Sequence, residues 1–170
     1  MTEGKILEDK VIVEDAAAAK ELFDSGWYGN LAGEKLELAF AEALLLQERG
    51  RLDIMRDGKK MKFADFYHFC SRNKRFASLY AVYKDLRERG LPVRIGFKGS
   101  DFRVYERGAK PEKAENVKWI VFVAGEDYPC GLDLLERATK LAQNIRTVAL
   151  WAIVDNDGEP TYYVLSEIAP

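Results

Sequence analysis

The sequence of 170 residues contains few residues that could bind a metal or form a disulfide: one histidine, His68, and two cysteines. Cys70 and Cys130 lie far apart, without a CxxC spacing, and the single histidine lies near only the first of them. This arrangement argues against a zinc site and against a disulfide framework. We therefore expect no metal and no other cofactor.

Long apolar runs are also missing. No window approaches the roughly 18 uninterrupted apolar residues of a membrane helix. The first ten residues, MTEGKILEDK, lack the apolar core of a signal peptide. The sequence therefore predicts a soluble, cytoplasmic protein without a membrane partner.

The chain also has no excess of positive charge. It contains 26 Lys and Arg and 28 Asp and Glu, which gives a net charge of −2. A free-standing nucleic-acid binder usually carries an overall basic field. Any contact with nucleic acid must then be local or shared with a partner. What the chain does have is 48% hydrophobic residues, enough to bury a core in one domain or in two small ones.

Residues 1–72 are predicted to form a small domain of helices and strands. Residues 5–15 are typical of a short strand or hairpin, and Asp15 could cap a helix over 16–26. Apolar residues at helical spacing predict a second helix from Glu34 to Gly50. Asp57-Gly58 is the common signal for a two-residue hairpin turn, and a third helix is expected over 63–73.

The polar cluster SRNKR, residues 71–75, predicts a boundary before a second domain, 73–170. A helix is predicted over 75–90. Runs typical of strands follow at 92–99, 101–107, 117–123 and 148–154. One helix is inserted between the last two of these, over 130–147, and a closing strand follows Asp157-Gly158. This order predicts an α/β (α+β) protein, in which the second domain is a mixed sheet with helices packed on it.

Three separated blocks of the second domain carry a family resemblance: YAVYKDLRERGLPVRIGFKGSDFRVYERG at 80–108, KWIVFV at 118–123 and AIVDNDGEPTYYVL at 152–165. In order and spacing they resemble the C-terminal, restriction-endonuclease-like domain of archaeal tRNA-splicing endonuclease. The stretch AFAEALLLQERGRLDI, residues 39–54, is similar to that family's N-terminal domain.

The resemblance implies a metal-free cleavage of RNA, in which a 2′-hydroxyl attacks the adjacent phosphate and leaves a 2′,3′-cyclic phosphate and a 5′-hydroxyl. Such a reaction needs a base for the hydroxyl proton, an acid for the leaving oxygen and a cation beside the phosphorane. The family uses a tyrosine, a histidine and a lysine for these roles.

Only one of these three residues is retained in the matching positions. The tyrosine corresponds to Tyr105 in DFRVYERG, but the histidine position holds Asn116 and the lysine position holds Thr147. Asparagine transfers no proton at neutral pH and threonine carries no positive charge. Tyr105, with an ordinary pKa of about 10, is a weak base without neighbours to tune it, so a packing role is favoured for it.

The degenerate triad indicates a non-catalytic, structural subunit of a heterotetrameric splicing endonuclease of two plus two chains. Its partners would be the catalytic subunit and precursor tRNA. Two alternatives stay open: a nuclease active in its own right, with Tyr105 and an unrecognised acid such as Glu115 or Lys118, and an RNA-binding module without an enzyme role. His68 is expected to be a packed or surface residue.

The resemblance also suggests surfaces for the partner and for RNA. In the family the terminal strand builds the two-chain dimer and an acidic loop docks into a basic groove of the opposite dimer. The matching residues are Asp155, Asp157, Glu159, Tyr162 and Val164. The simpler alternatives are a solvated turn and an ordinary core strand. For RNA, phosphate contacts are expected at Arg103, Arg107 and Lys110.

Overall fold

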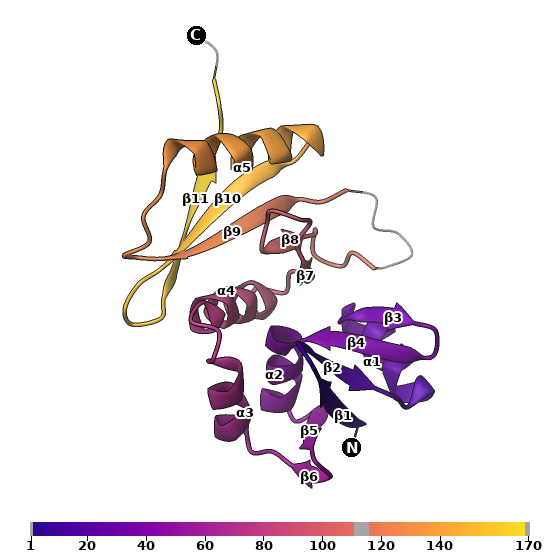
Figure 1. Ribbon diagram of the computed structural model, residues 1–170. Coiled ribbons are helices and arrows are strands. Elements are labelled where there is room, and N and C mark those ends of the chain that lie inside the picture. The colour runs from indigo at the N-terminus through magenta and orange to yellow at the C-terminus, as the bar shows by residue number, and fades with distance from the viewer. Residues whose placement is uncertain (1, 111–115, 169–170) are drawn as a thin grey trace. The chain divides into compact units, whose positions relative to one another are not determined.

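The computed structural model describes residues 2–110 and 116–168, and within them it contains five helices and two mixed sheets (Figure 1). This confirms the α/β class expected from the sequence. The chain divides into two compact units, 1–76 and 77–170, called unit 1 and unit 2. Compact units are not family domains, so the boundary predicted between residues 72 and 73 stays a prediction.

The sheet of unit 1 is built around β1 (Thr2–Leu7), which is antiparallel to β2 (Lys10–Val13) and parallel to β5 (Leu52–Arg56). With β3 (Asn30–Ala32), β4 (Lys35–Ala39) and β6 (Lys59–Lys60), the strand order is β3-β4-β2-β1-β5-β6. The predicted turn between β5 and β6 is confirmed: Asp57 and Gly58 have φ of 50° and 73°, as a type I′ turn requires.

Three helices complete unit 1. Helix α1 (Ala16–Gly26) begins as predicted after Asp15, whose Oδ1 accepts a 2.7 Å hydrogen bond from the Ala18 amide. Helix α3 (Phe63–Cys70) is also confirmed.

The helix predicted from Glu34 to Gly50 is wrong in its first part, because α2 spans only Phe40–Glu48. Residues 35–39 form β4 instead, in which Leu36 and Leu38 are buried and their neighbours are not. This alternation has the period of a strand, and the turn before it is made by Gly33 at a φ of 64°. The run of leucines across positions 36–46 concealed the change of period.

Unit 2 holds α4 (Phe76–Glu88) apart from its first residue, and a five-stranded sheet with the order β11-β10-β9-β8-β7. Its strands are β7 (Val93–Ile95), β8 (Phe102–Val104), β9 (Trp119–Gly125), β10 (Val148–Val154) and β11 (Pro160–Leu165). Only β9 and β10 pair in parallel, and α5 (Leu132–Asn144) connects them. The helix and strands expected for this part of the chain are confirmed.

Helices cover both faces of the sheet of unit 2. On one face α5 packs over β9 and β10, as Figure 1 shows, and buries Ile120, Phe122 and Trp151. On the other face the Tyr83 ring of α4 lies 5.7 Å from the Phe102 ring, measured between centroids. Strands covered on both faces read as continuous apolar runs, which is the pattern of β9 and β10.

Candidate functional site

The three positions that correspond to the family's triad lie at one end of three neighbouring strands. Because β8 is antiparallel to β9 and β9 is parallel to β10, the end of β8 meets the starts of the other two. Tyr105 follows β8, Asn116 lies shortly before β9, and Thr147 immediately precedes β10. The Lys118 amide donates a 2.8 Å hydrogen bond to the Val104 carbonyl and ties two of these ends together.

Tyr105 is almost completely covered. Only 7% of its surface is exposed, and its amide donates a 3.0 Å hydrogen bond to the Pro92 carbonyl. Asn116 is exposed, and its amide side chain cannot serve as a general acid at neutral pH. In this conformation the tyrosine is a packed residue of the strand end.

Thr147 acts as a structural link between β9 and β10. Its Oγ1 lies 2.8 Å from the Val117 carbonyl oxygen and 2.7 Å from the Lys118 carbonyl oxygen, so the hydroxyl can donate to either acceptor. The hydroxyl satisfies backbone groups just before β9 and supplies no charge. Arg146 precedes it with a φ of 53° and is exposed.

The cations in this part of unit 2 differ in how their side chains are held. Arg103 is held at the opposite strand, since its Nε donates to the Ile95 carbonyl at 2.8 Å and its guanidinium carbon lies 4.6 Å from the Phe97 ring centroid. Lys118 pairs with Glu106 at 2.8 Å. Arg107 and Lys110 are exposed. The predicted phosphate contacts at Arg103, Arg107 and Lys110 stay predictions.

A groove of about 630 Å³ in unit 2 is lined by two of these cations, Arg107 and Lys118. Its walls come from the end of α4, the segment after β8, and strands β9 to β11. The lining residues are Leu86, Arg89, Leu91, Glu106, Arg107, Lys118, Trp119, Leu150, Tyr162 and Val164. Lys118 Nζ lies 4.5 Å from the Trp119 ring centroid, so the groove combines apolar walls with a cationic rim.

Tyr162 and Val164, both predicted at the partner interface, have different surroundings. The Tyr162 hydroxyl donates a 2.7 Å hydrogen bond to Asp85 Oδ2, and the same carboxylate pairs with Arg89. Burial, followed by this hydrogen bond, raises the pKa of Tyr162 above its ordinary value. Val164 is 65% exposed on β11, which is an edge strand. Tyr163, 55% exposed, is an open aromatic residue that the sequence argument did not single out.

The acidic turn before β11 contains three exposed carboxylates, one of which accepts hydrogen bonds within the turn. Asp155 Oδ1 accepts hydrogen bonds from the amides of Asp157, at 3.0 Å, and Glu159, at 2.9 Å. The side chains of Asp157 and Glu159 are exposed. A partner that bound this turn would therefore meet mainly the last two.

The remaining candidate residues are not among the described residues of unit 2. His68 is exposed on α3 of unit 1, and Glu115 lies outside the described residues. Among the residues that the structure describes, no group of three or more His, Cys, Asp and Glu could hold a metal ion.

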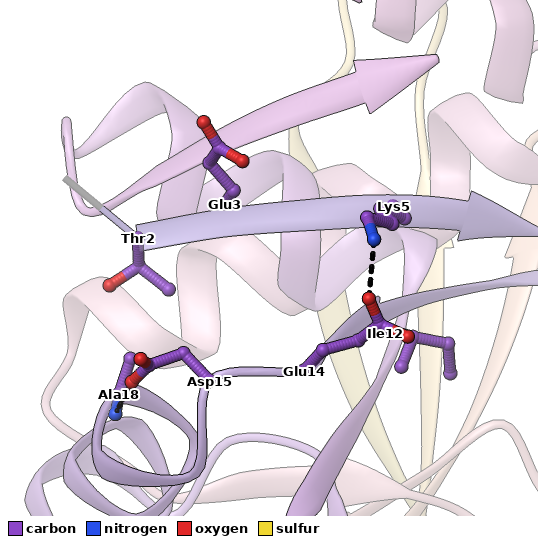
Figure 2. Close-up of a pocket in the computed structure, with 7 residues that line it drawn as sticks. All are labelled: Thr2, Glu3, Lys5, Ile12, Glu14, Asp15 and Ala18. Atoms are coloured by element: carbon purple, nitrogen blue, oxygen red, sulfur yellow. Dashed lines mark hydrogen bonds and ion pairs between the residues drawn. The ribbon is translucent and has the colours of Figure 1, made fainter. Parts of the chain in front are cut away.

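The hollow of about 480 Å³ in Figure 2 lies in unit 1 and contains three carboxylates. Asp15 caps α1, and Glu14 pairs with Lys5 and with Lys35, which lowers the pKa of Glu14. Two of its carboxylates are therefore already engaged within the protein.

The comparisons with known proteins cover both units. Residues 2–67 match the N-terminal domain of tRNA intron endonuclease, and residues 76–162 match the catalytic C-terminal domain. The chain belongs to the tRNA intron endonuclease family. The resemblance inferred from the three sequence blocks is thereby confirmed at the level of the family, whereas the subunit type stays a prediction.

Relatives of two lengths are similar to this chain. The tRNA-splicing endonuclease of Methanothermobacter thermautotrophicus is 31% identical over 169 residues, which are 99% of this chain and 98% of that protein. That of Thermococcus kodakarensis is 36% identical over 158 residues, 91% of each. That of Methanosarcina mazei is 37% identical over 163 residues, 95% of this chain but only 45% of that protein. The chain thus spans about half the length of the longer relatives.

No helix in the described ranges is long and apolar enough to cross a membrane.

Proposed function

We propose that this chain is a structural, non-catalytic subunit of a tRNA-splicing endonuclease. The complete enzyme would excise introns from precursor tRNA at bulge-helix-bulge sites and leave 2′,3′-cyclic phosphate and 5′-hydroxyl ends. The observation that carries the proposal is the chemistry at the strand ends, where Asn116 can donate no proton and Thr147 carries no charge.

The size of these losses supports the proposal. A general acid typically contributes about 10²- to 10⁴-fold in rate, and a charge stabiliser about 10²- to 10³-fold. The two losses need not multiply, but either one would cripple the site. The burial of Tyr105, which is 7% exposed, adds a further obstacle to its use as a base.

The surface of unit 2 supports an assembly role. An edge strand offers unpaired backbone groups to another chain, and on β11 the side chains of Tyr163 and Val164 are open to solvent. Asp157 and Glu159 are exposed in the preceding turn and could steer a basic partner surface into register. We place the catalytic subunit here, in a heterotetramer of two plus two chains.

The test is cleavage of an intron-containing precursor tRNA without added metal, by this chain alone, by a paralogue from the same source with an intact Tyr-His-Lys triad, and by the two mixed. We expect activity only in the mixture. Activity of this chain alone, abolished by Tyr105→Phe, would instead establish an active nuclease.

The mixture also distinguishes the role of Tyr105 in this chain from that of the equivalent tyrosine in the triad-bearing chain. Tyr105→Phe in this chain should leave the rate of the mixture unchanged, because the reaction takes place on the other subunit. The equivalent change in the triad-bearing chain should reduce the rate by several orders of magnitude. A large loss from Tyr105→Phe would contradict the proposal.

An active homomeric endonuclease is the second candidate. It is favoured by the relatives of matching length, since the Methanothermobacter thermautotrophicus and Thermococcus kodakarensis proteins are named tRNA-splicing endonuclease and correspond to 91% or more of this chain. The first arm of the experiment decides between the two. A chain that neither cleaves nor associates with the paralogue would be an RNA-binding module.

A further inference from the structure

The charges of unit 1 are divided sharply along the sequence. Residues 1–48 contain eleven Asp and Glu and four Lys, whereas residues 49–75 contain nine Lys and Arg and three Asp. The first stretch has a net charge of −7 and the second of +6. The near-neutral total of the chain therefore conceals a basic stretch of sequence of the kind that attracts phosphate groups. The stretch is not isolated from the acidic one, because Glu3 and Glu8 line a hollow together with Arg56 and Phe69.

Eight of the nine cations are exposed, and seven of these lie in the β5–β6 hairpin, just before α3 or between α3 and α4. The seven are Arg56, Lys59, Lys60, Lys62, Arg72, Lys74 and Arg75, here called the basic surface. Arg56 and Lys59 are opposite each other in the β5–β6 hairpin. The guanidinium carbons of Arg56 and Arg72 both lie 4.8 Å from the centroid of the Phe69 ring, so one ring joins the hairpin to the end of α3.

Several of these charges are not neutralised within the molecule. Lys60 pairs with Asp53 at 2.6 Å, and Arg56 lies 3.7 Å from the exposed carboxylate of Asp57. Within residues 2–110 and 116–168, no carboxylate lies within ion-pair distance of Lys59, Lys62 or Lys74. Within the described part of the chain, these three exposed lysines are therefore open to an external anion.

Aromatic rings are interspersed among the cations. Phe63 is 38% exposed and stacks on Tyr67, with ring centroids 6.4 Å apart and planes inclined by 23°. Phe69 is half-buried between its two arginines. Proteins hold RNA by combining cations, which contact the phosphate backbone, with flat aromatic rings, on which unpaired bases stack. An acidic protein partner would need only the cations.

We propose that the basic surface of unit 1 is an RNA-binding site that contacts the phosphate backbone through Lys59, Lys62 and Lys74. Its residues are different from those of the predicted phosphate contacts in unit 2. The choice of RNA as the ligand rests on the proposed function, while the site itself rests on the charges and rings described above.

The test uses the full chain and a fluorescently labelled precursor tRNA transcript. Binding is measured by anisotropy at several NaCl concentrations between 50 and 200 mM, for the wild type and for Lys59→Gln/Lys62→Gln/Lys74→Gln. Each lost phosphate contact lowers the slope of log K against log salt by about 0.7 to 0.9. We expect the triple variant to bind more weakly and its slope to fall by about 2 to 3.

The matched control is Lys10→Gln/Lys20→Gln/Lys35→Gln, which removes the same charge from the acidic stretch of unit 1. It should retain the wild-type affinity and slope. Circular dichroism would show that both variants are folded. The three test lysines have no ion-pair partner among the described residues, whereas Lys10 and Lys35 of the control lose their pairs with Glu37 and Glu14, so the control removes more native contacts than the test variant does.

Three results would overturn the proposal: no binding of the transcript by the wild type at 50 mM NaCl, equal affinity and slope in the two triple variants, or loss of association with another protein chain at unchanged RNA affinity. The last would identify a docking surface for an acidic protein. The proposed function fails differently, because cleavage by this chain alone would overturn it and leave the salt dependence intact.

Discussion

Cys70 and Cys130 differ in their access to water, and this difference sets their reactivity. Cys70 is buried at the end of α3, and Cys130 is exposed ahead of α5. Burial raises the pKa of the Cys70 thiol to about 12, because a thiolate would lose its hydration there. The thiolate is the reactive form of cysteine, so the two thiols should be chemically distinct.

We expect native protein at pH 8 to react rapidly with one equivalent of DTNB, at Cys130, and with the second only after unfolding in urea. Since an unfolded cysteine has a pKa of about 8.5, the Cys70 contribution to stability is complete below that pH and decreases as the pH rises toward about 12. Cys70→Ala should make the loss of stability above pH 8.5 less steep. Equal reaction rates of both thiols in the native protein would contradict this.

The residues of the candidate site were located by resemblance, but their surroundings were not predictable. The sequence identified Tyr105, Asn116 and Thr147 as one group, and the strand order brings their strand ends together. Neither the 7% exposure of Tyr105 nor the position of the Thr147 hydroxyl between two carbonyl oxygens follows from residue type. Both depend on backbone distant in sequence.

At the scale of elements, α2 is tied to the turn before β3 by one buried carboxylate. Glu42 Oε1 accepts a 2.9 Å hydrogen bond from the Gly29 amide, and its Oε2 accepts one of 2.9 Å from the Ala39 amide. Gly29 has a φ of 63°, and a side chain there would overlap the Glu37 carbonyl oxygen of β4. The close approach of turn, strand and helix therefore depends on this glycine.

Gly29→Ala should destabilise the protein more than Gly33→Ala, as measured by urea unfolding. Both glycines have a left-handed φ, 63° and 64°, but a side chain at Gly33 would meet no atom within 4 Å. The shared backbone cost is about 1 to 2 kcal/mol. We expect Gly29→Ala to lower the free energy of unfolding by at least about 1 kcal/mol beyond that, because overpacking typically destabilises a protein by about 1 to 3 kcal/mol. Equal losses would show that the turn can move aside.

Element prediction succeeded where local chemistry was unambiguous and failed where one apolar run crossed two elements. The cap at Asp15 and the turn at Asp57-Gly58 are local signals, and both are present. The leucines between Leu36 and Leu46 fit a helix, yet the first two belong to β4. The pairing of β4 with β2 and β3 decides the outcome, and such pairing is not visible in a short window.

At the scale of the whole molecule, the exposed apolar side chains of unit 2 are unequal candidates for an interface. Val164 lines a groove and lies on an edge strand, whereas Leu132, 84% exposed, lies on the first turn of α5. Exposed single residues are common and carry no implication by themselves. An open residue on an unpaired strand edge is a different case.

Val164→Asp should weaken association with the proposed catalytic subunit by about tenfold or more, since burial of an unpaired carboxylate costs several kcal/mol. Leu132→Asp is the control and should leave association unchanged. Light scattering of the mixed chains measures the complex, and cleavage by the mixture should fall in parallel. Equal behaviour of the two variants would argue against β11 as the interface.

The hydrogen bonds of Thr147 have a consequence for the history of the site. A lysine returned to this position would bring back a charge, but the carbonyls of Val117 and Lys118 would lose the hydroxyl donor that now serves them. In the proposed structural subunit, Thr147 would therefore contribute to the fold as well as lack the catalytic charge. On that proposal, the replacement of lysine by threonine would be easier to make than to reverse, and the chains of the enzyme would stay specialised.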